Sequence, residues 1–412
     1  MAIAVGLTEY TNMLKVLFPD GEVESAALHD TVWAKRIKKI DDFTGKELDF
    51  PLPFANGAGR SATFATAQSN ASAPLYAGWR LTRKTDYVVW QVTAEAIRAS
   101  RDDRGAFAAA QKNVGDMNLA EIGRSFSVGL YGTGGGGIGQ IATGGISGAT
   151  ATLTFAHDVR NFYKNQKIDV SAANDSTAAA RAGSPLTVLS VSYSAGTVTF
   201  TAGIVATVAA AVAGDFFIQQ GDEALKISGL SAWIPLTTPS ATLFNGVDRT
   251  ADPERLAGFR VNNPNGDPGE NLITLGELVS VGKPGRNQCI LINPIHYGSL
   301  LKSLSSKITY MRQGNSDTQG KMLIGGTGVM VGLSSGMAEI VVDADCPGGQ
   351  GWLLDEDTWE CHTLDAVPHL SAEDGRQALR GATTDTIEVR ARYWAEQLCK
   401  NPHRNGTFAT PV

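Results

Sequence analysis

The chain has 412 residues, of which 43% are hydrophobic and 18% charged, and its formal net charge at pH 7 is -6. This length suits two or three domains rather than one simple core. A general nucleic-acid binder is expected to be basic, so the charge excludes that class and leaves only loose, non-specific contact with DNA. The low charge and the 46 glycines suit a chain that buries much of its surface in contacts.

The cysteines are scattered and contain no C-x-x-C pair: they are Cys289, Cys346, Cys361 and Cys399. This pattern favours neither a zinc site nor a disulfide framework, and it predicts buried, reduced thiols. No apolar run approaches the ~20 residues that span a bilayer. The N-terminus lacks the basic and apolar regions of a secretory signal. We expect no contact with a membrane.

Residues 1–42 begin with a loose segment, and a helix is predicted over residues 22–40. A basic cluster lies near the end of this helix and consists of Lys35, Arg36, Lys38 and Lys39. One interpretation is that these cations complement the helix dipole on a solvated face. The other is an inward-facing patch that contacts a polyanion.

Residues 43–86 are predicted to form an extended hairpin. Between Phe50 and Trp79 the only ionised side chain is Arg60. Loops longer than ~15 residues are usually functional or disordered, and the aromatic residues here argue against disorder. We interpret this segment as an arm that lies on a neighbouring copy of the same protein. The candidates for inter-subunit contact are Phe54, Arg60, Phe64, Tyr76, Trp79 and Arg80.

The next two elements are a strand and a long helix. Residues 85–94 are rich in β-branched and aromatic side chains, which predicts the strand. An apolar stripe predicts a helix over residues 104–131, about 40 Å long at ~1.5 Å per residue. Gly132 ends the helix.

The middle of the chain changes composition. Residues 133–148 are rich in glycine and predict a joint. Residues 149–222 are rich in Thr, Val, Ser, Ala and Gly and predict a small all-β insertion, with a hairpin over 188–200.

Residues 223–375 mix predicted helices and strands. Helices are predicted over 272–281 and 294–304, and strands over 288–292, 329–331 and 339–342. A hairpin is predicted from 352–354 and 358–364, around an acidic turn. Residues 376–412 contain a long predicted strand over 384–398.

Two glycine motifs could indicate chemistry. Gly132–Gly137 matches G-x-G-x-x-G, but it follows a helix and opens none, so it predicts a flexible joint rather than a phosphate loop. Gly332–Gly336 matches G-x-S-x-G, but a predicted strand follows where a nucleophile elbow needs a helix. A plain turn is the favoured interpretation. The α/β serine hydrolase alternative would use Ser334 with downstream His362, Asp365 and His369.

Two acidic segments, Asp343–Asp345 and Asp355–Asp357, could bind a hard cation. Neither has the spacing of a calcium loop, and Asp is common in turns, so solvated turns are expected. His296 is expected to be a packed core residue. The sequence therefore predicts no enzymatic activity, no metal and no cofactor.

Three stretches carry a family resemblance by their order along the chain. They are residues 130–132 with the Gly-rich run after them, residues 340–359, and residues 389–402. In this order they resemble the tailed-bacteriophage major capsid (head) protein family. The resemblance implies an α+β fold with an N-terminal arm, an extended loop (the E-loop), a long spine helix, and peripheral and axial domains. The implied parts are 1–42 (N-terminal arm), 43–86 (E-loop), 87–132 (peripheral domain with the spine helix), 133–148 (joint), 149–222 (all-β insertion domain), 223–375 (axial domain) and 376–412 (C-terminal strand returning to the peripheral and axial domains).

The resemblance implies a structural protein that assembles as pentamers and hexamers into an icosahedral phage head around double-stranded DNA. Such a protein is located in the virion and assembled in the host bacterial cytoplasm. Its other partners would be a portal and a separate scaffolding protein, because Met1–Asp20 is too short for the scaffolding segment that some members carry, unless the chain is already trimmed. The resemblance is also compatible with a decoration protein that binds the shell.

Some family members cross-link a Lys of the E-loop to a neighbouring subunit. Residues 55–79 contain no Lys, so we expect non-covalent assembly. The alternative is a similar fold, the shell protein of a bacterial encapsulin nanocompartment. That protein would be smaller and would lack a β insertion of this size.

Overall fold

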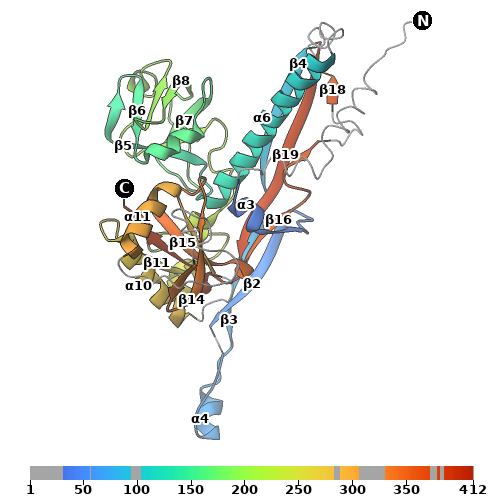
Figure 1. The fold of residues 1–412 in the computed structure, drawn as a ribbon. Helices are drawn as coiled ribbons and strands as arrows, with labels where there is room; N and C mark the ends of the chain where they lie inside the picture. The colour runs from blue at the N-terminus through green and yellow to red at the C-terminus, as the bar shows by residue number, and fades with distance from the viewer. Residues whose placement is uncertain are drawn as a thin grey trace, which may run out of the picture.

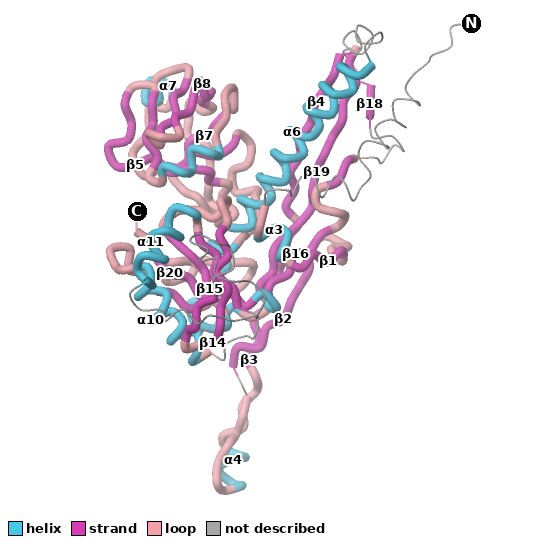
Figure 2. Tube along the Cα trace, viewed as in Figure 1, coloured by secondary structure: helices cyan, strands magenta, loops and turns pink. Residues whose placement is uncertain are grey.

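The computed structural model describes residues 31–55, 57–93, 104–282, 288–305, 330–371, 378–380 and 385–411. Figure 1 shows a body from which a long helix and strands rise together, a barrel beside them, and a thin arm that extends in the opposite direction. The two ends of the arm strands join the body, whereas its short helix α4 lies at the far tip (Figure 2).

The rising part is a sheet covered by one long helix, and we call it the long sheet. Its strands within the described residues are β1 (Lys38–Asp41), β4 (Lys84–Thr93), β16 (Trp359–Thr363), β17 (His369–Leu370), β18 (Ala378–Arg380) and β19 (Thr386–Cys399). The helix α6 (Arg104–Tyr131) lies along β4 and β19 (Figure 1). Alternate β19 residues point toward it, and the Tyr393 ring lies 5.2 Å from that of Phe126.

The body contains a second sheet, which we call the mixed sheet. Its strand order is β11-β20-β15-β12-β14-β13. The strands are β11 (Phe259–Val261), β12 (Gln288–Ile292), β13 (Met330–Leu333), β14 (Gly336–Val342), β15 (Gln350–Asp355) and β20 (Gly406–Ala409). The helices α10 (Pro268–Val281) and α11 (Pro294–Ser305) pack together beside it. Every residue of β12 is buried, as expected of a strand covered on both faces.

The barrel is a closed β structure of residues 137–219. Its strands are β5 (Gly137–Ser147), β6 (Thr150–Leu153), β7 (Lys167–Ser171), β8 (Leu186–Ser192), β9 (Thr197–Phe200) and β10 (Phe216–Gln219). Closure pairs β10 with both β5 and β7. The barrel has its own apolar core, in which the rings of Phe162 and Phe200 both pack on Phe217.

The arm is the hairpin of β2 (Glu47–Ala55) and β3 (Leu75–Thr82), with α4 (Phe64–Ser69) between them. The remaining short helices are α3 (Trp33–Arg36), α7 (Ile204–Thr207), α8 (Leu230–Trp233), α9 (Pro253–Ala257), η1 (Ala156–Asn161), η2 (Arg249–Ala251), η3 (Glu356–Thr358) and η4 (Pro402–Arg404).

Several predicted elements are confirmed. The helix predicted over 104–131 is α6, and the strand predicted over 384–398 is β19. The hairpin predicted over 188–200 is β8 with β9. All four cysteines are buried, free thiols.

Three predictions of local structure are wrong. The helix predicted over 22–40 ends in strand β1, which pairs with β16; its residues up to 30 lie outside the described part. The joint predicted over 133–148 contains β5, which closes the barrel against β10, so the barrel begins at Gly137. The hairpin predicted over 352–364 does not form, because η3 carries the chain from the mixed sheet to the long sheet. Strand β15 pairs with β12 and β20, whereas β16 pairs with β1 and β19.

Candidate inter-subunit surface

The base of the arm is anchored to its own chain by one apolar face. The β2 residues Leu48, Phe50, Leu52 and Phe54 alternate with exposed positions and pack against the main core. Period-two alternation is the pattern of a strand with one covered face. In addition, the Arg255 guanidinium donates a hydrogen bond to the Phe54 carbonyl oxygen. The candidate Phe54 is therefore half-buried within its own subunit.

Trp79 is not an inter-subunit contact, which corrects the prediction. Its side chain is fully buried. The ring lies 4.9 Å from that of Trp233 and 5.9 Å from that of Phe244, measured between centroids. Trp79 follows Ala77 on the inward face of β3, so the strand alternation points it into the core.

The tip of the arm, residues 57–75, has a different environment. None of the residues of α4 is buried, and the Phe64 side chain is 83% exposed. Tyr76 is 62% exposed, and Arg60 is also exposed. An apolar ring that stays exposed to water contributes no hydrophobic stabilisation to its own subunit. It would contribute stabilisation only where another surface covers it. The structure thus places Arg60 and Phe64 on this solvent-facing tip, and Tyr76 directly after it on the exposed side of β3.

Arg80 lies on the outward face of the arm, where its guanidinium Nε contacts Asp49 at 3.1 Å and Glu47 at 3.3 Å. Exposed pairs of this kind contribute about 0–1 kcal/mol, and their role here is to hold the side chain along the ribbon.

The basic cluster is engaged within its own chain. Arg36 contacts Glu339 at 2.5 Å and Glu356 at 3.2 Å, between guanidinium nitrogens and carboxylate oxygens. The Lys38 ammonium lies 3.1 Å from Glu360. These pairs tie the first described segment to β14, η3 and β16. Arg36 and Lys38 are therefore at least partly neutralised before any polyanion approaches.

Three aspartates of the acidic segments, Asp343, Asp345 and Asp355, are buried, so the prediction of solvated turns is wrong for them, whereas Asp357 is exposed. Asp343 is fully buried and accepts hydrogen bonds from the Trp33 amide at 3.0 Å, the Tyr131 hydroxyl at 2.8 Å and the Asp345 amide at 2.9 Å. It thereby joins the N-terminal segment, the end of α6 and the mixed sheet. Asp355 is also fully buried, and burial raises the pKa of its carboxyl.

The serine of the hydrolase alternative lies at the exposed tip of the hairpin between β13 and β14. Strand β14 follows Ser334, so the helix of a nucleophile elbow does not form and the motif is a turn, as predicted. His362 belongs to the long sheet and contacts Asp42 at 2.7 Å. His369 is also in the long sheet. The structure does not assemble these residues into one site.

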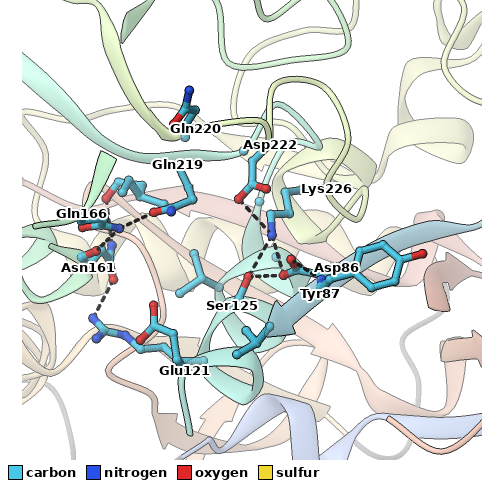
Figure 3. Close-up of a pocket in the computed structure, with 18 of the residues that line it drawn as sticks. Asp86, Tyr87, Glu121, Ser125, Asn161, Gln166, Gln219, Gln220, Asp222 and Lys226 are labelled. Carbon is cyan, nitrogen blue, oxygen red and sulfur yellow. Dashed lines mark hydrogen bonds and ion pairs between the residues drawn. The ribbon is translucent and has the colours of Figure 1, made fainter. Parts of the chain in front are cut away.

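A cavity of about 230 Å³ lies between α6, β4 and the barrel. Figure 3 shows the side chains that line it. The buried Lys226 ammonium lies 2.5 Å from Asp86 and 3.0 Å from Asp222, and donates to the Ser125 hydroxyl at 2.9 Å. Burial works against the charge of Lys226, but the two carboxylates outweigh it and raise its pKa. Burial, with repulsion from Asp86, raises the pKa of Asp222 to about 6.

Two further pairs of polar side chains cross the cavity. Arg124 donates to the Asn161 side chain at 3.0 Å. Gln166 donates to Gln219 at 2.6 Å (Figure 3). Because Arg124 lies on α6 and Asn161 beside the barrel strands, the cavity is a polar joint between the barrel and α6. Sequence reasoning missed it because its members come from four distant segments.

The described residues carry neither a metal-binding cluster nor a membrane-spanning helix. In this part of the chain, no group of three or more His, Cys, Asp or Glu side chains could hold a metal ion. Helices long and apolar enough to cross a membrane are also absent from it.

No protein-family model matches the sequence, and no curated protein matches it. Among solved structures, the chain is similar to one from the cyanophage A-1(L) capsid asymmetric unit, with a TM-score of 0.50 and 11% identity over 93% of this chain and 91% of that one. It is also similar to a chain from the capsid of the native GTA particle, with a TM-score of 0.47 and 9% identity over 94% and 91% of the two chains. A third similar chain comes from the crystal structure of the virus-like particle from Pyrococcus furiosus, with a TM-score of 0.39 and 10% identity over 97% of this chain and 99% of that one.

The likeness to the cyanophage chain shows that the two proteins share a fold across nearly their whole lengths. The α+β capsid-protein fold expected from the sequence is thereby confirmed.

Proposed function

We propose that this chain is the major capsid protein of a tailed-bacteriophage head, and that it assembles as pentamers and hexamers around double-stranded DNA. The observation that carries the proposal is the arm tip, a segment with Arg60 as its one ionised side chain and an exposed Phe64 ring, which projects from a body with a capsid-protein fold. A closed shell requires one chain to make many heterologous contacts, and a projecting arm supplies such a contact.

In this proposal the arm is the E-loop, α6 is the spine helix, the long sheet belongs to the peripheral domain and the mixed sheet to the axial domain. The barrel is an insertion domain. A separate scaffolding protein and a portal assist assembly in the host cytoplasm, and a decoration protein could bind the finished shell. The size of the barrel supports a phage head over the alternative, an encapsulin nanocompartment.

The arm tip provides the test. Phe64→Asp places a charge where a neighbouring subunit is expected to cover the ring, and burial of an unpaired charge is costly. We expect this variant to remain folded and to lose assembly, measured by negative-stain electron microscopy and analytical ultracentrifugation. Phe64→Leu, the matched control, keeps an apolar side chain and should assemble. Equal particle yields from both variants would show that Phe64 is not covered.

A further inference from the structure

The barrel has an apolar core that is separate from the rest of the subunit. The buried apolar residues of this core lie between Ile141 and Phe217, and none of them belongs to the two other apolar clusters of the described residues. Two segments connect the barrel to the rest, residues 132–136 before β5 and residues 220–229 after β10. We call them the two crossings. Parts of a chain that are joined in this way move relative to each other unless a large apolar interface holds them together.

The two crossings run side by side and contain unusual backbone. The Ala224 amide of the second crossing donates a hydrogen bond to the Gly135 carbonyl oxygen of the first at 3.3 Å. Gly134 and Gly221 both have a φ of 87°, and Ala224 has a φ of 58°. This left-handed region is costly for a residue with a Cβ, and backbone outliers of this kind are enriched at switch regions. The crossings therefore form a narrow ribbon that can serve as a hinge.

A short barrel element, η1, contacts the rest of the subunit on two sides. On one side, the Arg160 guanidinium lies 3.0 Å from the Asp345 carboxylate in the loop between β14 and β15. On the other side, Arg124 of α6 donates hydrogen bonds to the Arg160 carbonyl oxygen and to the Asn161 side chain. These contacts place η1 between α6 and the mixed sheet.

The packing around η1 is loose. A second cavity, of about 430 Å³, lies between η1 and the loop after β14, in addition to the cavity beside β4. The Asp345 side chain at this contact is only 3% exposed. Removing one partner of a buried ion pair leaves an uncompensated charge, which is strongly unfavourable. Loss of Arg160 should therefore favour a position of the barrel in which water reaches Asp345.

We propose that the barrel is a hinged module that swings as a unit about the two crossings, and that the Arg160–Asp345 ion pair holds it in the observed position. The motion replaces polar contacts of η1 by contacts with water and leaves the apolar cores on both sides intact. It changes the angle between the barrel and α6. The inference concerns the single subunit and does not depend on the proposed assembly.

A native cysteine reports on this motion. Cys346 is 1% exposed and lines the cavity between η1 and the loop after β14. A polyethylene-glycol maleimide is too large to enter the closed cavity, so its rate of reaction with Cys346 measures the fraction of open molecules. The internal controls are the buried cysteines of the two sheets, Cys289, Cys361 and Cys399. In wild-type subunits we expect Cys346 to react faster than these controls by about tenfold or more.

Three variants test the role of Arg160. Arg160→Met leaves Asp345 without its cation in the closed position and should raise the labelling rate of Cys346 by about tenfold or more. Arg160→Lys, the matched control, keeps a cation and should stay within about threefold of the wild type. Lys164→Met removes an exposed barrel charge that lines neither cavity and should leave the rate unchanged. The labelling rates of the three control cysteines should be the same in all variants, as measured by peptide mass spectrometry.

Two results would overturn the inference. If Arg160→Met and Arg160→Lys label Cys346 at the same rate, the ion pair does not hold the barrel. If all four cysteines of the wild type react at one rate, the subunit opens only by global unfolding and the barrel is not a separate module. Because the experiment uses unassembled subunits, neither result bears on whether the chain forms shells.

Discussion

Replacing Trp79 by Ala separates the two roles that an aromatic residue of the arm could have. Trp79 is fully buried between Trp233 and Phe244, and its indole Nε1 has no hydrogen-bond partner among the described residues. The loss is therefore one of packing. Truncating a buried Trp to Ala costs about 3–5 kcal/mol, which includes aromatic contacts worth roughly 0.5–1.5 kcal/mol per pair. We expect Trp79→Ala to lower the free energy of unfolding by about 4 kcal/mol.

Urea unfolding of the unassembled subunit, followed by far-ultraviolet circular dichroism, measures this loss. The control is Phe64→Ala at the arm tip, where an 83% exposed ring should change the free energy of unfolding by less than about 0.5 kcal/mol. Phe64→Ala should nevertheless weaken assembly. If Trp79→Ala left the unfolding free energy within about 1 kcal/mol of the wild type and abolished assembly, Trp79 would be an interface residue and the packing argument would be refuted.

Three further predictions concern buried charge. Asp343→Ala leaves three buried donors unpaired and should lower the free energy of unfolding by about 3–5 kcal/mol in urea titration, with a smaller loss for Asp343→Asn; equal losses would contradict the hydrogen-bond argument. Lys226→Met leaves the Asp86 and Asp222 carboxylates facing each other and should lower the free energy of unfolding by about 3–5 kcal/mol. Part of this stability should return at pH 5, where a carboxylate can take up a proton. A loss that does not depend on pH would contradict the charge-repulsion argument. Burial raises the pKa of Glu396 to about 8, so the stability it contributes is full below about pH 4.5 and is lost as the pH rises through 8. Glu396→Gln should therefore reduce the dependence of the melting temperature on pH between about 4.5 and 8. If the melting temperature of the variant changes with pH as steeply as that of the wild type, Glu396 does not titrate in this range.

The spacing of apolar residues within short segments correctly predicted the long helix and the long strand. The helix over 104–131 has apolar residues at helical spacing and a glycine after its end, although Met117 of the predicted stripe is exposed. The first part of β19 alternates, whereas its last five residues are all buried. Each element was predicted with nearly correct bounds. The G-x-S-x-G turn followed from the strand pattern after it.

Pairing between distant segments could not be predicted in the same way. Two apolar runs around a short acidic turn look like a hairpin, yet β15 and β16 each find partners far away in different sheets. The burial of Asp343 depends on the Trp33 amide, 310 residues earlier in the chain. No spacing in the sequence signals that contact.

Two signals in the arm were available and were missed. Ala77, Trp79 and Leu81 alternate with exposed residues on β3, which marks Trp79 as inward-facing despite its uncharged surroundings. The two-residue spacing of Pro51 and Pro53 indicates an edge strand with a blunted outer side. Read together, these patterns would have separated the anchored base of the arm from its exposed tip.

The most direct test of the central proposal is negative-stain electron microscopy of the purified chain beside analytical ultracentrifugation, alone and with a candidate scaffolding protein. We predict rings of five and six subunits or uniform closed shells, with particles larger than those of a nanocompartment. A monomer or dimer under every condition would contradict the capsid proposal and return attention to Ser334 and an esterase assay.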